Sequence, residues 1–422
     1  MTTCPAPATT GSAPSTTGPG TTGQALAQAG SGTVRGRRYR IAAALCALAV
    51  LPATAAFGTP AAVAAEVRPD ALVTMGDSFL SGEGARWQGN AEGLKNFGGI
   101  PQALRDATDR VKTAGIGLEK IYSPGCHRAD AAVIGAGAPK RFNIACSGAA
   151  TTHLSRNFRA EESQLARLRT LATENNVTVV VVSVGGNDVR LTDTMTVCAD
   201  AWKNDRYCST DPAVTGPAAE RVRTVGAKVA QAVEAVRAAV KDTGSTPRVL
   251  VQSYPMPLAS GKAATTAAHD ENGWDRWSVY GCPFYNRDLR WIATGLGAAL
   301  NREIKKAAVR TGADHVDLGR LLEGHQVCGK QPLQTAFAAD GAVVSPPAAK
   351  AEWARYVPRT RTELPADEAQ ELLHPNHYGQ QALGRCLTLV VARLATAEPR
   401  TDAQCRGAAG EAPEKVGVTF RR

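Results

Sequence analysis

Three patterns are missing from this sequence, and each absence excludes a class of protein. The apolar run at 41–51 is too short to cross a bilayer, which needs about 20 apolar residues, so we expect no transmembrane span. No run of lysine and arginine is interleaved with aromatic residues, so nucleic-acid binding has little support. No Cys-x-x-Cys pair is present, which argues against a zinc site. We therefore expect neither a bound metal nor a cofactor.

The first 65 residues resemble an export signal and not part of a folded domain. Residues 1–33 contain no aromatic and no charged side chain, so they cannot bury enough apolar surface to fold. Four arginines between 35 and 40 are followed by the apolar run and then by a small-residue tract that ends in Ala64-Ala65. This order is typical of a secretory signal peptide, so we predict cleavage after Ala65 and an extracellular protein. The long polar start also fits a true translation start at Val34 instead of Met1.

The remaining chain is predicted to form one domain. Removing residues 1–65 leaves 422 − 65 = 357 residues and lowers the net charge from +10 by four arginines to +6. That length suits one large domain or two small ones, and we predict a single domain at 66–405. The mildly basic balance is that of an ordinary solvated surface. We expect a monomer with a disordered tail at 406–422.

The cysteines of the exported chain are even in number, which indicates disulfide bonds. Eight cysteines allow 105 pairings, so the sequence alone leaves the connectivity open. Sequential pairing closes the shortest loops and is our prediction. The pairs would be Cys126 with Cys146, Cys198 with Cys208, Cys282 with Cys328, and Cys386 with Cys405.

Strand-like and helix-like patterns alternate along the mature chain. The run at 177–184 is almost entirely β-branched, which is typical of a strand buried on both faces of a parallel sheet. Valines spaced by three and four between Val222 and Val240 predict a long helix. The alternation predicts an α/β fold with a parallel sheet. The irregular stretches 82–141, 254–286 and 319–370 are predicted to be loops around the active site, with Trp274 and Trp277 either lining a pocket or filling a small core.

Small polar residues follow three of the predicted strands. Ser78 comes after the apolar run 71–75 and Gly76, and Gly148 and Asn187 follow the next two strands. Because parallel strands end at one edge of a sheet, these residues can converge there. Ser78 is the candidate nucleophile, and the Gly148 N–H and the Asn187 amide are candidate oxyanion donors. Each residue alone also suits an ordinary turn.

A serine nucleophile needs a base, and His374 is the best placed of the seven histidines. It lies just before the last predicted helix, and Pro375 restricts its backbone. Glu371, three residues earlier, is a candidate for the acid that orients the imidazole, although a solvent-facing carboxylate is equally plausible. His377 is the local rival as a base. Together with His374 it forms a His-x-x-His pair, but no third metal ligand has a suitable spacing.

Four blocks of this sequence, in order, resemble those of the SGNH (GDSL) hydrolase family. They are Gly76-Asp77-Ser78, the Gly148 turn, Gly185-Gly186-Asn187-Asp188 and His374-Pro375-Asn376. The cysteines are similar to those of its secreted actinobacterial esterases and lipases. The resemblance implies a three-layer α/β/α flavodoxin-like sandwich with a parallel sheet of about five strands. It also implies Ser78 as nucleophile, His374 as base, and Ser78, Gly148 and Asn187 as oxyanion donors. The family usually has Asp where this chain has Glu371, and some members use a backbone carbonyl instead.

The leading hypothesis is therefore a secreted esterase or lipase that cleaves carboxylic acyl esters through an acyl-enzyme. The substrate would be a small-molecule or lipid ester. A carbohydrate O-acetyl esterase with the same machinery is the alternative, in which aromatic loops bind sugar. A non-catalytic binding protein on the same fold is a third possibility, but four intact blocks argue against it.

Overall fold

The structure is a computed structural model that describes residues 67–90, 125–129, 140–261, 275–278, 280–330, 332–334, 336–337, 343–357, 370–396 and 400–421. The chain divides into two units, 1–64 and 65–422, and only the second contains described residues. The proposed signal peptide, its cleavage site and the alternative start at Val34 therefore lie outside the described residues. The same holds for Trp274 and for most of the loop at 82–141.

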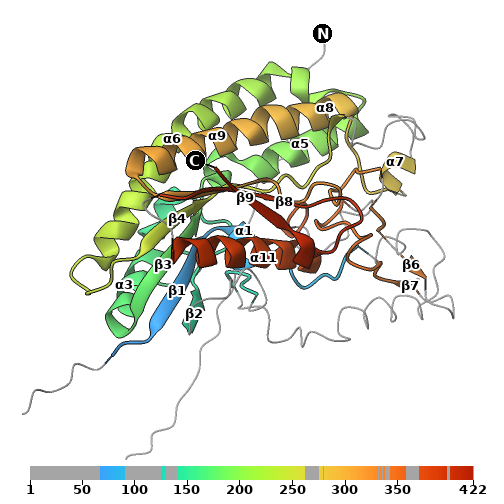
Figure 1. Ribbon diagram of the computed structural model, residues 1–422. Helices are drawn as coiled ribbons and strands as arrows, with labels where there is room; N and C mark the ends of the chain where they lie inside the picture. Colours follow the sequence, from blue (N-terminus) through green and yellow to red (C-terminus); the bar gives the residue numbers. More distant parts are fainter. Residues whose placement is uncertain are drawn as a thin grey trace, which may run out of the picture. The chain divides into compact units, whose positions relative to one another are not determined.

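A seven-stranded sheet forms the centre of the domain (Figure 1). Its strands in spatial order are β2 (Lys140–Asn143), β1 (Asp70–Gly76), β3 (Asn176–Ser183), β4 (Arg248–Gln252), β5 (Asp314–Arg320), β8 (Asp402–Arg406) and β9 (Gly417–Arg421). All neighbouring pairs are parallel except β8 and β9. The first five strands are parallel, as predicted, and their order 2-1-3-4-5 is that of a flavodoxin-like sheet. Their carboxyl ends therefore share one edge.

Helices cover both faces of this sheet, which gives three layers (Figure 1). Helix α6 (Pro212–Val240) packs between α3 (Gln164–Glu174) and α9 (Ala298–Thr311), and α11 (His377–Leu394) lies on the opposite face. The valine stripe of α6 is buried along its whole length, as its spacing predicts. Helix α9 continues a short helix, α8 (Asn286–Arg290), and a π-helical turn, η6 (Trp291–Gly297).

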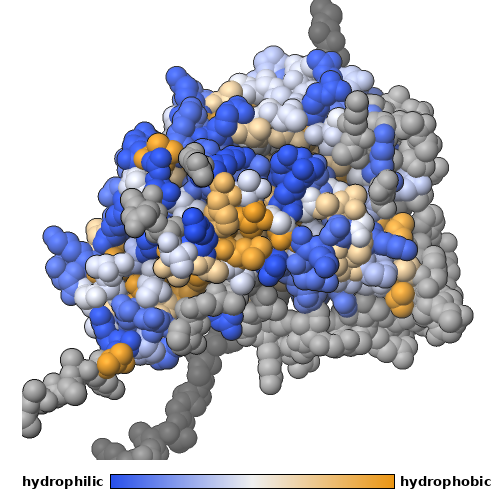
Figure 2. All heavy atoms as spheres, in the orientation of Figure 1, coloured by the Kyte–Doolittle hydropathy of each residue, from blue (hydrophilic) through white to orange (hydrophobic). Residues whose placement is uncertain are grey.

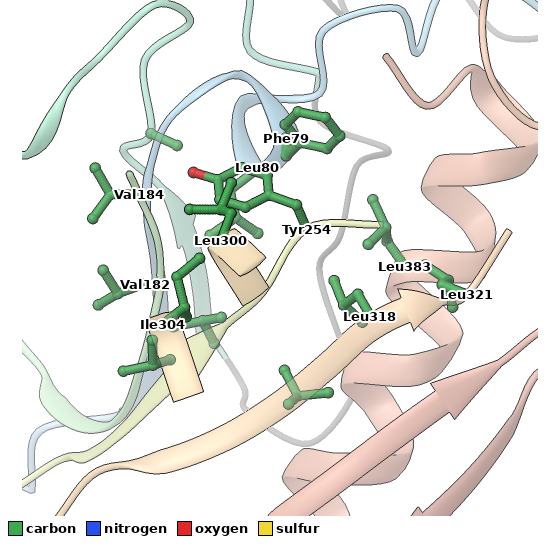
Figure 3. Packing of buried hydrophobic residues seen from close by; sticks show 14 of the residues in the cluster. Phe79, Leu80, Val182, Val184, Tyr254, Leu300, Ile304, Leu318, Leu321 and Leu383 are labelled. Atoms are coloured by element: carbon green, nitrogen blue, oxygen red, sulfur yellow. The ribbon is translucent and has the colours of Figure 1, made fainter. Parts of the chain in front are cut away.

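The apolar core lies between these layers. Val182 lies in β3 and Val184 follows it, while Leu300 and Ile304 of α9 and Leu383 of α11 approach the sheet (Figure 3). Five consecutive residues of β3, Val179 to Ser183, are buried, which confirms a strand covered on both faces. On the molecular surface, hydrophilic residues dominate the face shown in Figure 2, with hydrophobic residues in small groups.

The carboxyl-terminal part of the chain corrects two predictions. Residues 406–422 were expected to be a disordered tail, yet β9 pairs with β8 along its full length up to Arg421. The sheet also has more than the expected five strands. Both added strands are short and polar, and in β8 only Ala403 and Cys405 are buried, so no apolar run marks them. Helix α5 (Leu191–Lys203) is a further element that the sequence patterns did not predict.

Four disulfides link parts of the domain, and short elements occur within the predicted loops. The pairs are Cys126–Cys146, Cys198–Cys208, Cys282–Cys328 and Cys386–Cys405, which is the sequential pairing predicted above. Within the predicted loops, α7 (Asp275–Ser278) and an antiparallel pair, β6 (Ala336–Phe337) and β7 (Val343–Val344), are formed. None of the helices in the described part of the chain is long and apolar enough to span a bilayer.

Candidate active site

The turn that carries Ser78 is built at the carboxyl end of β1. Gly76 has φ of +133°, and a Cβ atom there would lie 1.8 Å from the carbonyl oxygen of Ser183 on β3. Only glycine fits this close approach. The side chain of Gln164 on α3 clamps the turn, because its Oε1 accepts from Gly76 N at 2.7 Å and its Nε2 donates to Gly76 O at 2.8 Å.

Ser78 is the first residue of a one-turn helix, α1 (Ser78–Ser81). The Asp77 carboxylate caps this turn by accepting from Phe79 N at 3.2 Å, and it also accepts from the hydroxyl of Tyr254. Complete burial raises the pKa of Asp77 to about 7, against the lowering effect of these two hydrogen bonds. The Tyr254 hydroxyl in turn accepts from Gly186 N at 2.8 Å and so links the Ser78 turn to the Asn187 turn. Asp77 therefore holds the turn that carries the candidate nucleophile, as expected from the sequence.

The structure brings His374 onto Ser78. Nε2 of His374 lies 2.8 Å from Oγ of Ser78, and Nδ1 lies 3.1 Å from the main-chain carbonyl oxygen of Leu372. Leu373, which lies between Leu372 and His374, has φ of +61°. The chain therefore turns back there, which brings the Leu372 carbonyl oxygen to Nδ1 of the imidazole. Burial lowers the pKa of His374 below its usual value, opposed in part by the negative charge of Glu83. A neutral imidazole with Nδ1 as donor has Nε2 ready to accept a proton from Ser78.

Glu371 does not occupy the position of the acid. Its carboxylate is buried and pairs with Arg86, at 2.7 Å between Nε and Oε1, and also accepts from the indole N–H of Trp87. The guanidinium of Arg355 lies over that indole ring, 4.1 Å from its centre. The candidate role of Glu371 is thus corrected: the atom that faces Nδ1 of His374 is the Leu372 carbonyl oxygen, and Glu371 instead fixes the segment before His374.

The candidate oxyanion donors lie on neighbouring turns. Gly148 has φ of +83° and follows Cys146, whose disulfide holds this turn. Within the described residues, the main-chain N–H groups of Ser78 and Gly148 donate no hydrogen bond, so both are available to a ligand. One N–H of the Asn187 amide donates to Ala149 O at 3.0 Å, which fixes the side chain and leaves its second N–H.

The remaining sequence candidates have structural contacts. Asp188 accepts from both the main-chain N–H and the hydroxyl of Thr151, so it holds a turn. His377, the rival base, lies in the first turn of α11 and contacts Gln381 at 3.0 Å. No group of three or more His, Cys, Asp or Glu side chains with metal-site geometry occurs among the residues that the structure describes.

Two tryptophans of the predicted loops that the structure describes are packed and not presented to solvent. Trp277 is 7% exposed and packs in a small cluster with Trp202 and Tyr285. Trp353 is fully buried and stacks on His325. Of the two interpretations of Trp277, the structure supports the small core and not the lining of a pocket.

Several residues at the site were missed by the sequence patterns. Glu83 follows Ser78 by five residues and is fully buried, and it pairs with His127. Gln370 joins Glu83 to the Ser147 hydroxyl. None of these residues is adjacent to a strand end except Ser147, so the pattern that identified the other candidates could not find them. A charged residue between two glycines, Gly82-Glu83-Gly84, was the one available signal.

Comparison with known proteins places this site in a family. The sequence model of the GDSL-like lipase/acylhydrolase family matches residues 74–382, which include Ser78, Gly148, Asn187 and His374. No curated protein matches the chain significantly.

Solved structures similar to the chain include an extracellular lipase from Streptomyces rimosus, with 18% identity over 77% of this chain and 99% of the lipase and a TM-score of 0.43. Phospholipase A1 from Streptomyces albidoflavus NA297 has 19% identity over 77% and 99%, with a TM-score of 0.42. Est24, a carbohydrate acetylesterase from Sinorhizobium meliloti, has 14% identity over 58% and 82%, with a TM-score of 0.23.

Proposed function

Because the chain belongs to the GDSL-like lipase/acylhydrolase family and is thus a carboxylic ester hydrolase, we propose that it cleaves acyl esters outside the cell through an acyl-enzyme on Ser78. The observation that carries this proposal is the 2.8 Å contact between Ser78 Oγ and His374 Nε2. A hydroxyl at hydrogen-bond distance from a buried neutral imidazole is the arrangement that nucleophilic ester hydrolysis needs.

In the first half of the reaction, Ser78 Oγ attacks the ester carbonyl carbon while His374 Nε2 takes the hydroxyl proton. The tetrahedral oxyanion accepts hydrogen bonds from the main-chain N–H groups of Ser78 and Gly148 and from the Asn187 amide. His374 then returns the proton to the leaving alkoxide, and the alcohol departs. Water repeats the sequence on the acyl-enzyme, with His374 as base, and releases the carboxylic acid.

The Leu372 carbonyl takes the orienting part that an acid has in a Ser-His-Asp triad. It accepts a hydrogen bond from Nδ1–H of His374, so it selects the tautomer in which Nε2 is the base. A carbonyl carries only a partial charge, which stabilises the imidazolium less than a carboxylate does.

Export is the second part of the proposal. Four disulfides are typical of a protein that folds in an oxidising compartment. The basic, apolar and small-residue order at 35–65 supplies a route out of the cell. We propose a monomer that acts on small-molecule or lipid esters. The burial of Trp277 removes one argument for a carbohydrate substrate.

The test uses hydrolysis of 4-nitrophenyl butyrate and labelling by a serine-reactive phosphonate. The purified protein should hydrolyse the ester and form a stoichiometric adduct on Ser78. Ser78→Ala should abolish both, and His374→Ala should reduce hydrolysis at least about 1,000-fold while circular dichroism stays unchanged. Turnover retained in Ser78→Ala, or an adduct on another residue, would refute the mechanism. Release of fatty acid from phospholipid against acetate from acetylated xylan then separates the substrate classes.

A further inference from the structure

A buried carboxylate lies next to the proposed catalytic centre without a part in the mechanism above. Glu83 is fully buried, and its main-chain N–H donates to Ser78 O at 3.1 Å. Its Oε1 lies 2.8 Å from Nδ1 of His127, and its Oε2 accepts from Gln370 Nε2 at 3.1 Å. Gln370 also donates to the hydroxyl of Ser147 at 2.6 Å. The cluster therefore joins the Ser78 turn, the Gly148 turn and the segment that leads to His374.

His127 is held in place by the covalent structure around it. It follows Cys126, whose disulfide to Cys146 and whose carbonyl contact with Ser147 N anchor it to the Gly148 turn. Its φ of +48° is in the left-handed region, which a non-glycine residue adopts only at an energetic cost. Such strain persists only where surrounding contacts enforce it, and here they direct the imidazole onto Glu83.

Glu83 is also close to His374. The residue after it, Gly84, lies so near that a Cβ atom there would be 3.5 Å from the Cβ of His374 and 3.0 Å from Pro375 O. Burial by itself raises the pKa of Glu83, but the hydrogen bond from His127 and the charges of His374 and His127 outweigh it, so the net pKa is lowered. Glu83 is therefore ionised at neutral pH. The same charge acts in the opposite direction on His374, where it favours the imidazolium.

The other charged groups around this cluster have hydrogen-bond or ion-pair partners of their own. They are Glu371 with Arg86 and Arg355, Asp77 with Tyr254, Arg128 with Glu161, and Arg159, whose guanidinium donates to Gly125 O at 2.7 Å. The hydrogen bond to Glu83 has the largest effect on the pKa of His127 and leaves this pKa raised. Among the smaller effects, Arg159 lowers the pKa of His127 and Glu371 raises it. Of these groups, Glu83 is the one whose charge has the largest effect on the pKa of His374 after that of burial.

A hydrolase of this kind forms an imidazolium in each half of its reaction, and here burial opposes that charge. The Leu372 carbonyl orients the ring but brings no full negative charge to it. We propose that Glu83 is a positioning residue that supplies this charge through space, and that His127 sets its strength. With His127 protonated, the Glu83–His127 pair has no net charge. Once His127 loses its proton, the carboxylate acts on His374 undiminished.

This inference rests on the proposed function, and it predicts that two single substitutions have opposite effects. Glu83→Gln keeps the hydrogen-bonding shape and removes the charge, so the pKa of His374 should fall. His127→Gln keeps a donor for Glu83 and removes the cation, so the pKa of His374 should rise. A merely structural role for the pair would not move this pKa in opposite directions.

The readout is the acid limb of the pH profile of kcat/KM with 4-nitrophenyl butyrate, which reports the pKa of the base in the free enzyme. We expect the wild-type limb below pH 6.5, a shift of at least about 0.5 unit downward in Glu83→Gln, and a similar shift upward in His127→Gln. In Glu83→Gln, kcat should also fall about tenfold or more with little change in KM. Glu220→Gln, an exposed carboxylate paired with Arg223 on α6, is the matched control and should leave the profile unchanged.

The proposal would be overturned if the acid limbs of the pH profiles of Glu83→Gln and His127→Gln moved in the same direction. It would also be overturned if neither limb moved although both variants were folded. If Glu83→Gln does not fold, the acid limb of His127→Gln decides by itself: an upward shift supports the proposal and an unmoved limb contradicts it. The same titration followed by histidine ring NMR signals in wild-type protein gives a second measurement, in which the His374 signal should respond to ionisation of His127. Ester turnover that persists in Ser78→Ala refutes the proposed function itself, whereas turnover that depends on Ser78 with unmoved limbs refutes only this inference.

Discussion

The Nδ1 atom of His374 lies 3.1 Å from the main-chain carbonyl oxygen of Leu372, two residues earlier in the chain. A side-chain acid at this position can be substituted away, but a main-chain carbonyl stays with any residue that keeps the backbone in place. The orientation of the proposed base therefore depends on the left-handed conformation of Leu373, which is held by hydrogen bonds between Leu373 N and Arg355 O and between Arg355 N and His374 O.

Replacing Glu371 by Gln should reduce kcat less than about tenfold, because its carboxylate binds Arg86 and Trp87 and not His374. Loss of the true acid of a triad costs roughly 10,000-fold. Stability should fall by roughly 1–3 kcal/mol, since Arg86 loses its charged partner. Steady-state kinetics and urea denaturation measure the two effects. A loss of activity near the triad value in folded protein would contradict the assignment of the Leu372 carbonyl.

Glu352 should make the protein less stable as the pH rises. Its carboxyl group is buried near Asn90, and burial raises its pKa to about 8 from 4.5. Between these values the folded protein holds a proton that the unfolded chain releases, so the free energy of unfolding falls by up to about 1.4 kcal/mol per pH unit. Glu352→Gln removes this slope. The variant should be more stable than wild type at pH 8 in urea denaturation, and this advantage should shrink towards pH 5; an equal difference at both pH values would contradict it.

Two disulfides of nearly equal loop length should differ in their effect on catalysis. Cys126–Cys146 spans 20 residues and Cys386–Cys405 spans 19, so replacing either pair by serine should cost a similar amount of stability, about 3 kcal/mol. Only the first pair anchors the Gly148 turn. At a temperature where both double variants are folded, we expect a drop in kcat for the first and near wild-type kcat for the second. Equal activity of the two would show that the Gly148 turn does not need its disulfide.

Alanine at Gly76 should prevent stable folding, because its Cβ atom would lie 1.8 Å from Ser183 O and its φ of +133° is unfavourable for alanine. Gly216 on α6 is the matched control. No atom lies within 4 Å of the position of a Cβ there, and alanine in a helix is favoured over glycine by about 0.5–1 kcal/mol. Thermal melting should therefore show a large loss for Gly76→Ala and a small gain for Gly216→Ala. A Gly76→Ala protein that melts like wild type would refute the close approach of β1 and β3.

Much of the fold is predictable from local patterns, and the exceptions have identifiable causes. The run of β3 and the valine stripe of α6 bury apolar side chains at the periods of a strand and a helix, so both could be predicted. Strands β8 and β9 are short, polar and close to the edge of the sheet, and they gain their stability from pairing and from the Cys386–Cys405 bond. Pairing between distant segments leaves no periodic signal.

In the proposed site, too, some residues could be predicted from local patterns and others could not. Ser78, Gly148 and Asn187 follow buried strands, and the geometry of a parallel sheet is enough to bring them together. The sequence left Glu371 and a backbone carbonyl as alternative partners of His374, because the direction of the Glu371 side chain depends on the backbone of Leu373. Glu83 and His127 meet across 44 residues of sequence, most of them outside the described ranges, so only the folded chain shows their contact.

The position of β8 and β9 at the edge of the sheet has a consequence for synthesis. Residues 402–421 complete a sheet whose first strand begins at Asp70, so β5 has no partner on its outer edge until residues 402–406 of β8 have been synthesised. A chain that is exported while unfolded needs such a delay, since a finished domain does not pass through a narrow translocation channel. On the export route proposed above, this sheet would be completed only on the far side of the membrane, where Cys405 would also meet the oxidising conditions that join it to Cys386.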